Sequence, residues 1–582
     1  MFGFVRGSLL ASLFIGLLVP SFCIASDDLQ DAADSARWRA LLHLSGKGRA
    51  AIANPGFLLS FPDINAADEM RLTIELLRAD PQAACRFPAR HYYLTQVLQI
   101  NLPQAECPGL DEFMRKAPLE ELSLIYASEN LTQPSSMMGH TMLAIAGTND
   151  QGQYVEHSVS FFTELESINL PVIMWDTLVV GKKGYFSVQP LSMAMNNYLV
   201  TEQRNVWRYP VQLNDEQKAL IQRHLWELKQ TDIAYFFDRH NCATLSQDIL
   251  AVAYPELASQ GEMITPLDVV RNSRQAGITA DAGVYASNRW KVRLLREFTG
   301  IDDRDALYSP AETESASGQL RLLQAHAFNN YQLEHGDISR AEWQERNAAL
   351  PASDVRIDLA GYRSPLKVPA DSQWSAAYQH RQGDDWLTLS WMPASHTLED
   401  DNRNYFSENE LVLSEFAASV NLDNAALRLD RWRIYSVRSL IPYDELTGGL
   451  SGYLQFGFER YYDEMLSVRP GFLASAGLGR TYGLSRDFYI YGLLGAGAVL
   501  GTDQQYLQLE PEVGAYLYEV WDMKSWLSYK TFLNKLYAPQ RQLSVTHSLL
   551  AGDDYGVMLG WNRRWTHEAR EVNWELKARL YY

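Results

Sequence analysis

Strand-like alternation over residues 373–582 constrains the fold of this chain more than any other feature of its sequence. Successive side chains of a β-strand point to opposite faces, so an alternating segment has one apolar face and one polar face. The clearest apolar sets, each alternating with charged, polar or small residues, are Val572, Trp574, Leu576, Ala578, Leu580 and Tyr582; Leu507, Leu509, Pro511, Val513, Ala515 and Leu517; and Leu454, Phe456 and Phe458. A closed barrel with lipid outside and polar residues inside requires this pattern.

The number of such segments supports an antiparallel transmembrane β-barrel. We count about twelve candidate strands of roughly ten residues each, with Tyr and Trp near their ends. The last strand ends on an aromatic residue, and in these respects the segment resembles bacterial outer-membrane barrels. A soluble β-sandwich also alternates, but isolated charges on the polar face and the placement of the aromatic residues favour the barrel.

The N-terminus has the layout of a secretory signal, which we place at residues 1–25. One positive charge at Arg6 precedes an apolar run that ends at Phe22, and Ala25 is the expected cleavage position. Lipidation of Cys23 is an alternative, but the residues before it match the pattern poorly. No later stretch approaches the roughly 20 apolar residues that a membrane helix needs. We therefore predict a bacterial outer-membrane protein whose remaining domains face the periplasm.

Charge and residue patterns divide the rest of the chain into three units. Residues 27–115 are helical in pattern, residues 118–290 mix short β-like runs with helices, and residues 291–370 form a polar helical connector before the barrel at 373–582. The 51 basic and 70 acidic residues give a formal charge of −19, which argues against nucleic acid as a partner. We expect a helical N-terminal domain, an α+β domain, a connector and a barrel.

The four cysteines leave one odd thiol in a chain bound for an oxidising compartment. Cys85 and Cys107 lie 22 residues apart in the helical domain and are expected to form a disulfide. With Cys23 in the signal, Cys242 remains. It follows Asn241 at the predicted start of a helix, where free backbone N–H groups favour a thiolate and could hold an oxyanion.

Two histidines in the same domain could serve this thiol. His140 begins one predicted strand and His157 lies on the next, so a hairpin could bring them together on one face, one as base and the other to orient it. Gly139 would let backbone or substrate approach closely. We expect the catalytic residues Cys242, His140 and His157. The residues expected to form the substrate and oxyanion neighbourhood are Asn241, Ala243, Gly139 and Ser136.

The order of these residues resembles a known family. His, His, then Asn-Cys at a helix start is similar to the circularly permuted papain-like thiol enzymes, which include lecithin retinol acyltransferase and relatives of the NlpC-type peptidases. Met138-Gly-His-Thr-Met-Leu and Phe237-Asp-Arg-His-Asn-Cys-Ala look more closely like the Lnb-type periplasmic domain, which is linked to N-acylation of bacterial lipoproteins. The resemblance covers residues 118–290 and implies a permuted papain-like α+β fold.

Several alternatives remain open for these residues. Cys242 could be a small buried hydrophobic residue, and His157 an ordinary strand residue. His240 is interpreted as a loop residue that shapes the entry to the thiol. A zinc site from His140, His157 and Cys242 lacks paired-ligand spacing, so we expect neither metal nor cofactor.

The predicted function is a cysteine-dependent acyltransferase held at the outer membrane, with a thioester on Cys242 as intermediate. The expected partners are outer-membrane lipids, with a phospholipid as acyl donor and lipoproteins as acceptors. One alternative is a cell-wall amidase or peptidase with the same Cys-His dyad. The other is a barrel channel whose periplasmic domain only binds or plugs.

Overall fold

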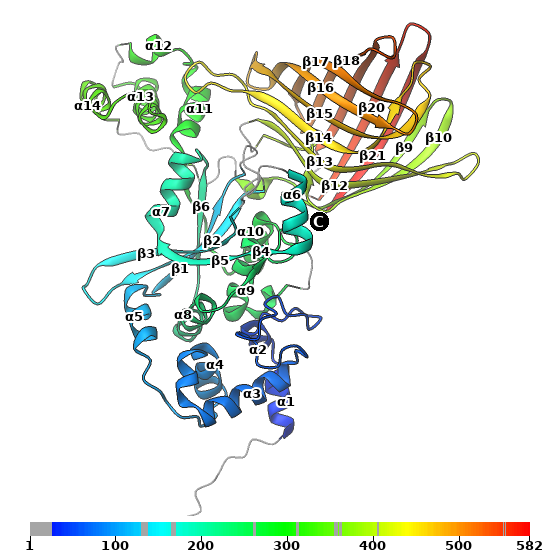
Figure 1. Cartoon of the computed structure of the whole chain (residues 1–582). Coiled ribbons are helices and arrows are strands. Elements are labelled where there is room, and N and C mark those ends of the chain that lie inside the picture. Colours follow the sequence, from blue (N-terminus) through cyan, green and yellow to red (C-terminus); the bar gives the residue numbers. More distant parts are fainter. Residues whose placement is uncertain are drawn as a thin grey trace, which may run out of the picture.

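A computed structural model of the chain describes residues 26–129, 138–164, 170–259, 263–309, 314–353, 359, 364–403, 407–550, 552 and 554–582 (Figure 1). The expected signal segment 1–25 and Ser136 lie outside the described residues. Among the residues that are described, no helix is both long and apolar enough to span a membrane.

The first unit is a group of short helices joined by buried polar contacts. Their bounds are α1 Ser26–Asp34, α2 Ala36–Leu41, α3 Ala66–Ala79, η1 Pro81–Cys85, α4 Pro88–Tyr92, η2 Tyr93–Val97 and α5 Pro108–Lys116. Cys85 is disulfide-bonded to Cys107, which ties η1 to the start of α5. Arg90 of α4 is fully buried against Glu69 of α3 and Glu227 of the next unit. The helical unit therefore shares its core with the domain that follows.

The second unit is a six-stranded antiparallel sheet in the order β5-β3-β2-β1-β6-β8. Its strands are β1 Glu121–Ala127, β2 His140–Thr148, β3 Tyr154–Phe162, β5 Tyr185–Pro190, β6 Val206–Val211 and β8 Gly283–Tyr285; its helices and short strands are α6 Leu170–Trp175, η4 Asp176–Val180, β4 Lys182–Lys183, α7 Leu191–Asn196, η5 Asn197–Thr201, α8 Asp215–Lys229, β7 Ala234–Tyr235, α9 Cys242–Ala253, η6 Pro255–Leu257 and α10 Pro266–Gln275. The predicted β2–β3 hairpin is confirmed. This sheet with α9 forms the α+β domain that the sequence predicts.

The two faces of the sheet are covered by different helices. Leu143 and Ile145 of β2 point to the main core, which includes Leu250 of α9. Met142 and Ala144 point to a smaller cluster formed with α7 and η5. Because neighbouring residues of a strand face opposite ways, each position of β2 is assigned to one of these two environments.

Four helices form the described part of the connector, and the first of them contacts two loops of the barrel, β13–β14 and β15–β16. Their bounds are α11 Asn288–Thr299, α12 Arg304–Tyr308, α13 Ala316–His335 and α14 Arg340–Ala349; η7 Pro365–Lys367 leads to the barrel. Ser287 caps α11, so this helix begins slightly before the expected boundary at residue 291. Arg293 donates to Thr447 Oγ1 (2.9 Å) and Arg296 to Asp444 Oδ2 (2.8 Å). The connector thus docks on the β13–β14 loop.

The C-terminal unit is a closed antiparallel barrel of 12 strands, as the sequence predicts. The strands are β9 Gln373–Arg381, β10 Asp384–Met392, β12 Glu408–Asn421, β13 Leu427–Leu440, β14 Ser451–Tyr462, β15 Val468–Gly483, β16 Phe488–Gly501, β17 Gln505–Glu519, β18 Met523–Asn534, β19 Gln540–Leu550, β20 Tyr555–Trp565 and β21 Arg570–Tyr581, with the short β11 Ser395–His396 alongside β12. Pairing of β10 with β12 closes the sheet. Figure 1 shows the barrel as a separate body beside the sheet domain.

The alternation read from the sequence decides which way each barrel side chain points. On β17, Leu507 and Leu509 are 77% and 52% exposed on the outside, whereas Glu510 and Glu512 are buried inside. The interior carboxylates are paired; Glu512, for example, accepts from Arg438 (2.7 Å). An apolar outer surface around a charged, paired interior is the arrangement of a barrel surrounded by lipid.

Candidate thiol site

Cys242 is the first residue of α9, and Asn241 caps that helix. The Asn241 side-chain oxygen accepts from the N–H groups of Ala243 (2.8 Å) and Thr244 (3.0 Å), and its amide donates to Phe237 O (2.8 Å). These bonds fix the start of the helix, because the cap satisfies donors that the helix itself leaves open. They also occupy the Asn241 side chain and the Ala243 N–H, two groups expected to face the substrate.

The backbone N–H of Cys242 is differently placed. It sits at the first helical position, and no protein acceptor for it occurs among the residues that the structure describes. A free N–H next to the sulfur, at the positive end of the helix dipole, is the donor best placed to hold an oxyanion on a carbonyl attacked by that sulfur.

The thiol is buried (7% exposed) and is the one free cysteine among the described residues. Burial raises the pKa of Cys242 above its usual range, and hydrogen bonds from the Thr141 backbone and hydroxyl and from the Ala243 backbone oppose that rise. The Thr141 hydroxyl has no conventional partner elsewhere. At neutral pH the resting site therefore holds a protonated thiol, which needs a base before it can attack.

His140 is the first residue of β2 and follows a glycine with positive φ. Gly139 has φ +86°, and a Cβ there would meet the Ala127 carbonyl at 2.9 Å, so only glycine fits this approach. Burial, together with the positive charge of Arg204, lowers the pKa of His140 to about 3. The imidazole is therefore neutral at physiological pH, and its low pKa makes it a weak base in this buried, substrate-free site.

The thiol and His140 share neighbours but not a hydrogen bond. Thr141 contacts the thiol from the α9 face of β2, whereas the His140 ring lies 5.9 Å from that of Tyr198 on the other face. The positive charge of Arg204 lowers the pKa of both Cys242 and His140. A proton could pass between them only around the end of β2, and such contacts are often loose without substrate.

His157 is not brought to this group. The strand register places it opposite Ile145, five residues along β2 from His140, which corresponds to about 17 Å at the rise of a strand. It lines a surface hollow with Val188, Trp226 and Lys229, and partial burial lowers its pKa. The expected pairing of the two histidines on one face does not occur in this register.

His240 lies two residues before the thiol and points into the core. Its Nδ1 lies 2.8 Å from the Ala234 carbonyl, its ring packs on Phe161, and its Nε2 is buried without a partner. Burial lowers its pKa to about 4. Neutral His240 thus helps to hold the loop before Cys242.

Three residues next to the thiol carried no signal in the sequence: Thr141, Tyr198 and Arg204. Arg204 is buried, donates to the Ala127 carbonyl (2.9 Å) and to Glu202 (2.7 Å), and stacks over Tyr198 at 5.1 Å. It comes from the segment after η5, which folds over the ends of β1 and β2. Contacts made by chain segments so far apart leave no local motif.

No group of three or more His, Cys, Asp and Glu side chains within the described ranges is arranged to hold a metal. The zinc alternative needed His157 beside His140 and Cys242, and the register separates them. The groups that the structure places at this site are a thiol, a neutral imidazole and backbone donors.

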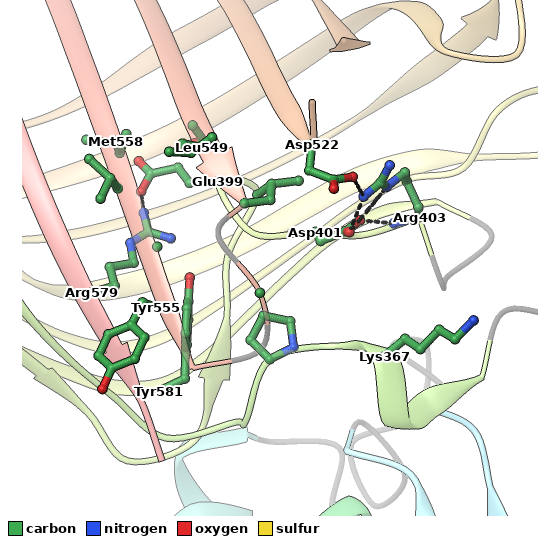
Figure 2. A pocket seen from close by; sticks show the side chains of 16 residues that line it. Lys367, Glu399, Asp401, Arg403, Asp522, Leu549, Tyr555, Met558, Arg579 and Tyr581 are labelled. Carbon is green, nitrogen blue, oxygen red and sulfur yellow. Dashed lines mark hydrogen bonds and ion pairs between the residues drawn. The ribbon is translucent and has the colours of Figure 1, made fainter. Parts of the chain in front are cut away.

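A second hollow lies at the rim of the barrel and has a different chemistry (Figure 2). Arg403 pairs there with Asp401 (2.6 Å) and Asp522 (2.9 Å), and Arg579 pairs with Glu399. Its lining includes no cysteine or histidine. The paired charges make it part of the rim structure rather than a second thiol site.

Three family models match parts of the chain. Residues 110–276 match the model of the Lnb N-terminal periplasmic domain. Residues 363–581 and 30–97 match two domains of unknown function, DUF7840 and DUF7843. No curated protein matches the chain.

Several solved structures of outer-membrane pores and of a transport unit resemble part of this chain at low identity. The KdgM porin is 8% identical over 36% of this chain and 99% of its own, with a TM-score of 0.23. The outer-membrane channel DcaP of Acinetobacter baumannii is 10% identical over 38% and 100%, with a TM-score of 0.21. The transport unit of the autotransporter AIDA-I from Escherichia coli is 11% identical over 39% and 93%, with a TM-score of 0.22. Likeness at this level does not extend to function.

The matched domain and the apolar outer face of the barrel locate the molecule. The barrel presents many exposed apolar side chains on its outer face, and residues 110–276 before it match a periplasmic family. The chain thus joins a segment that matches the Lnb N-terminal periplasmic domain to a closed β-barrel of 12 strands, and this combination supports an outer-membrane location with that segment in the periplasm.

Proposed function

We propose that this protein is a cysteine-dependent acyltransferase that takes an acyl group from a lipid ester at the inner surface of the outer membrane. One observation carries the proposal: Cys242 is buried at a helix start with its own N–H free, beside donors from Thr141. A structural cysteine needs neither the free donor nor the capped, fixed helix start. The helix-on-sheet arrangement is also what a permuted papain-like enzyme would need.

The chemical steps follow from the groups present. Neutral His140 accepts the thiol proton as the sulfur attacks the ester carbonyl, and the Cys242 N–H holds the oxyanion. The carbon–oxygen bond breaks, the leaving alkoxide takes the proton from His140, and a thioester remains. An amine of the acceptor then attacks the thioester, an amide forms, and the thiol is regenerated.

Two readouts distinguish this reaction from its closest alternative. Wild type and Cys242→Ser are compared for the acyl content of envelope lipoproteins and for the muropeptide profile. A change in acylation alone supports the acyltransferase; a change in muropeptides alone supports an amidase with the same thiol. After incubation of the purified chain with a phospholipid, intact-mass analysis should detect one added acyl group on wild type and none on Cys242→Ser.

A channel is a second candidate, favoured by the barrel interior. A charged cavity lies within the barrel, and its lining includes Arg433, Glu510 and Lys530. If transport is the function, Cys242→Ser should leave lipoprotein acylation and the muropeptide profile unchanged. Deletion of the barrel should then change the permeability of the envelope to small solutes.

A further inference from the structure

An apolar patch on the sheet domain continues the lipid-facing surface of the barrel. The segment α6–η4, residues 170–180, carries four exposed apolar side chains: Val172, Trp175, Val179 and Val180. Trp175 and Val180 are each 62% exposed and Val179 is 54% exposed. Large exposed apolar groups gathered in one short segment mark an interaction surface.

The inward side of the same segment is fixed to the domain. Ile173 and Thr177 are buried, and the Thr177 hydroxyl donates to the Ile173 carbonyl (2.7 Å). Val172, Trp175 and Val179 follow at helical spacing on the outward side. The segment therefore has one face in the core and one apolar face that the described residues leave uncovered.

This segment is bonded to the loop that leads to the thiol. The Phe237 N–H donates to the Thr177 carbonyl (3.0 Å), and Arg239 donates to the Leu178 carbonyl (3.3 Å). Phe237 in turn accepts from Asn241, the cap of α9. The patch and Cys242 are thus joined through a single short loop.

The same loop packs on the outside of the barrel. Phe237, with Met138 and Met263, contacts a cluster formed by Ala394, Leu411, Leu413, Tyr435, Val437 and Phe456. On β13, Arg438 points into the barrel, toward Glu512, so Val437 faces outward by strand alternation. The patch therefore continues the surface that meets lipid.

We propose that α6–η4 is seated in the periplasmic leaflet of the membrane that the barrel spans, with Trp175, Val179 and Val180 among the lipid acyl chains. The occupant is phospholipid, because the patch is continuous with the lipid-facing barrel and carries Trp, the side chain enriched at membrane interfaces. Such a seat would open the thiol domain to lipid next to Cys242. The seat itself does not depend on the proposed chemistry; its use for lipid delivery rests on the proposed function.

Fluorescent labelling in proteoliposomes tests the seat directly. In a Cys242→Ser background, the full chain carries an environment-sensitive dye at Val179→Cys, or at Tyr154→Cys as the control. Tyr154 is also exposed (56%) but lies at the β2–β3 hairpin. Lipids brominated on their acyl chains should quench the dye at 179 and not at 154, and aqueous iodide should do the reverse.

Two outcomes overturn the proposal. One is a dye at 179 as open to iodide as the dye at 154. The other is protection of 179 in native envelopes but not in pure phospholipid vesicles, which would identify a protein partner instead. A separate measurement addresses delivery: Val179→Asp/Val180→Asp should lower acylation of Cys242 by vesicle lipid about tenfold relative to a soluble short-chain ester. If the double variant leaves the ratio of the two acylation rates unchanged while brominated lipid quenches the dye at position 179, α6–η4 lies in the membrane but does not deliver lipid to Cys242.

Discussion

Strand β17 of the barrel and helix α9 of the thiol domain bury opposite kinds of side chain. On β17 the leucines are exposed and the glutamates are enclosed. On α9 Ile249 and Leu250 are buried, and the reactive groups beside the helix, Cys242 and His140, are neutral at physiological pH. The barrel interior instead holds full charges in pairs, such as Arg438 with Glu512.

The difference follows from what surrounds each unit. Lipid accepts apolar side chains and excludes charge, so the barrel must keep its charges inside and paired. Water accepts charge, so the thiol domain can bury apolar groups and must neutralise or pair any titratable group it encloses. Where the two units meet, apolar side chains of the thiol domain must pack on the apolar outer face of the barrel, as Phe237 does.

The largest expected effect comes from breaking a buried ion pair in the helical unit. Arg90→Met leaves Glu69 and Glu227 buried without their partner, at a cost of about 3–5 kcal/mol of unfolding free energy. This loss of unfolding free energy is measured by denaturant unfolding of the full chain in detergent, with limited proteolysis of the helical unit as the readout. Arg71→Met, at an exposed ion pair, is the control and should leave the transition in place.

A charge on the outer face of the barrel should cost slightly less. Val513 is exposed near the middle of β17, and Val513→Arg should destabilise the barrel by about 2–4 kcal/mol if this position faces the bilayer centre. Reversible unfolding in phospholipid vesicles measures the change, with Val513→Leu as the matched apolar control. Equal stability of the two variants would mean that this face does not meet lipid.

The barrel was predictable because its signal is local. Alternation along β17 and β21 needs only the period of a strand and a lipid surround, and the same holds for the cap at Asn214 that begins α8. The helix start at Cys242 was equally local. These features depend on residues a few positions apart.

The site was only partly predictable because it depends on register and on distant contacts. Whether His157 reaches His140 is decided by the pairing across the β2–β3 turn, which places His157 opposite Ile145. Arg204 reaches the thiol only because η5 folds over the sheet. Neither relation has a fixed spacing in the sequence that could have revealed it.

The neutral state of the thiol site can be tested through its pH dependence. Burial raises the pKa of Cys242, so the thiolate fraction should grow about tenfold per pH unit over the whole range below that value. The rate of alkylation by iodoacetamide should therefore climb without a plateau between pH 6 and 8. A plateau there would indicate a thiolate–imidazolium pair. Cys242→Ser provides the blank, since Cys85 and Cys107 are bonded to each other.

The smallest expected effect concerns the two asparagine caps. It distinguishes the contribution of a cap to stability from its contribution to the reactivity of Cys242. Asn214 and Asn241 each form a capping box, at the start of α8 and of α9, so the loss of either cap in an Ala variant should cost about 1 kcal/mol of unfolding free energy. Only Asn241 fixes the helix start that carries Cys242, so only Asn241→Ala should also change the rate of thiol alkylation. Asn241→Ser, which can still cap, should restore much of that rate. Equal alkylation in Asn241→Ala and Asn214→Ala would mean that the helix start matters to the fold and not to the reactivity of Cys242.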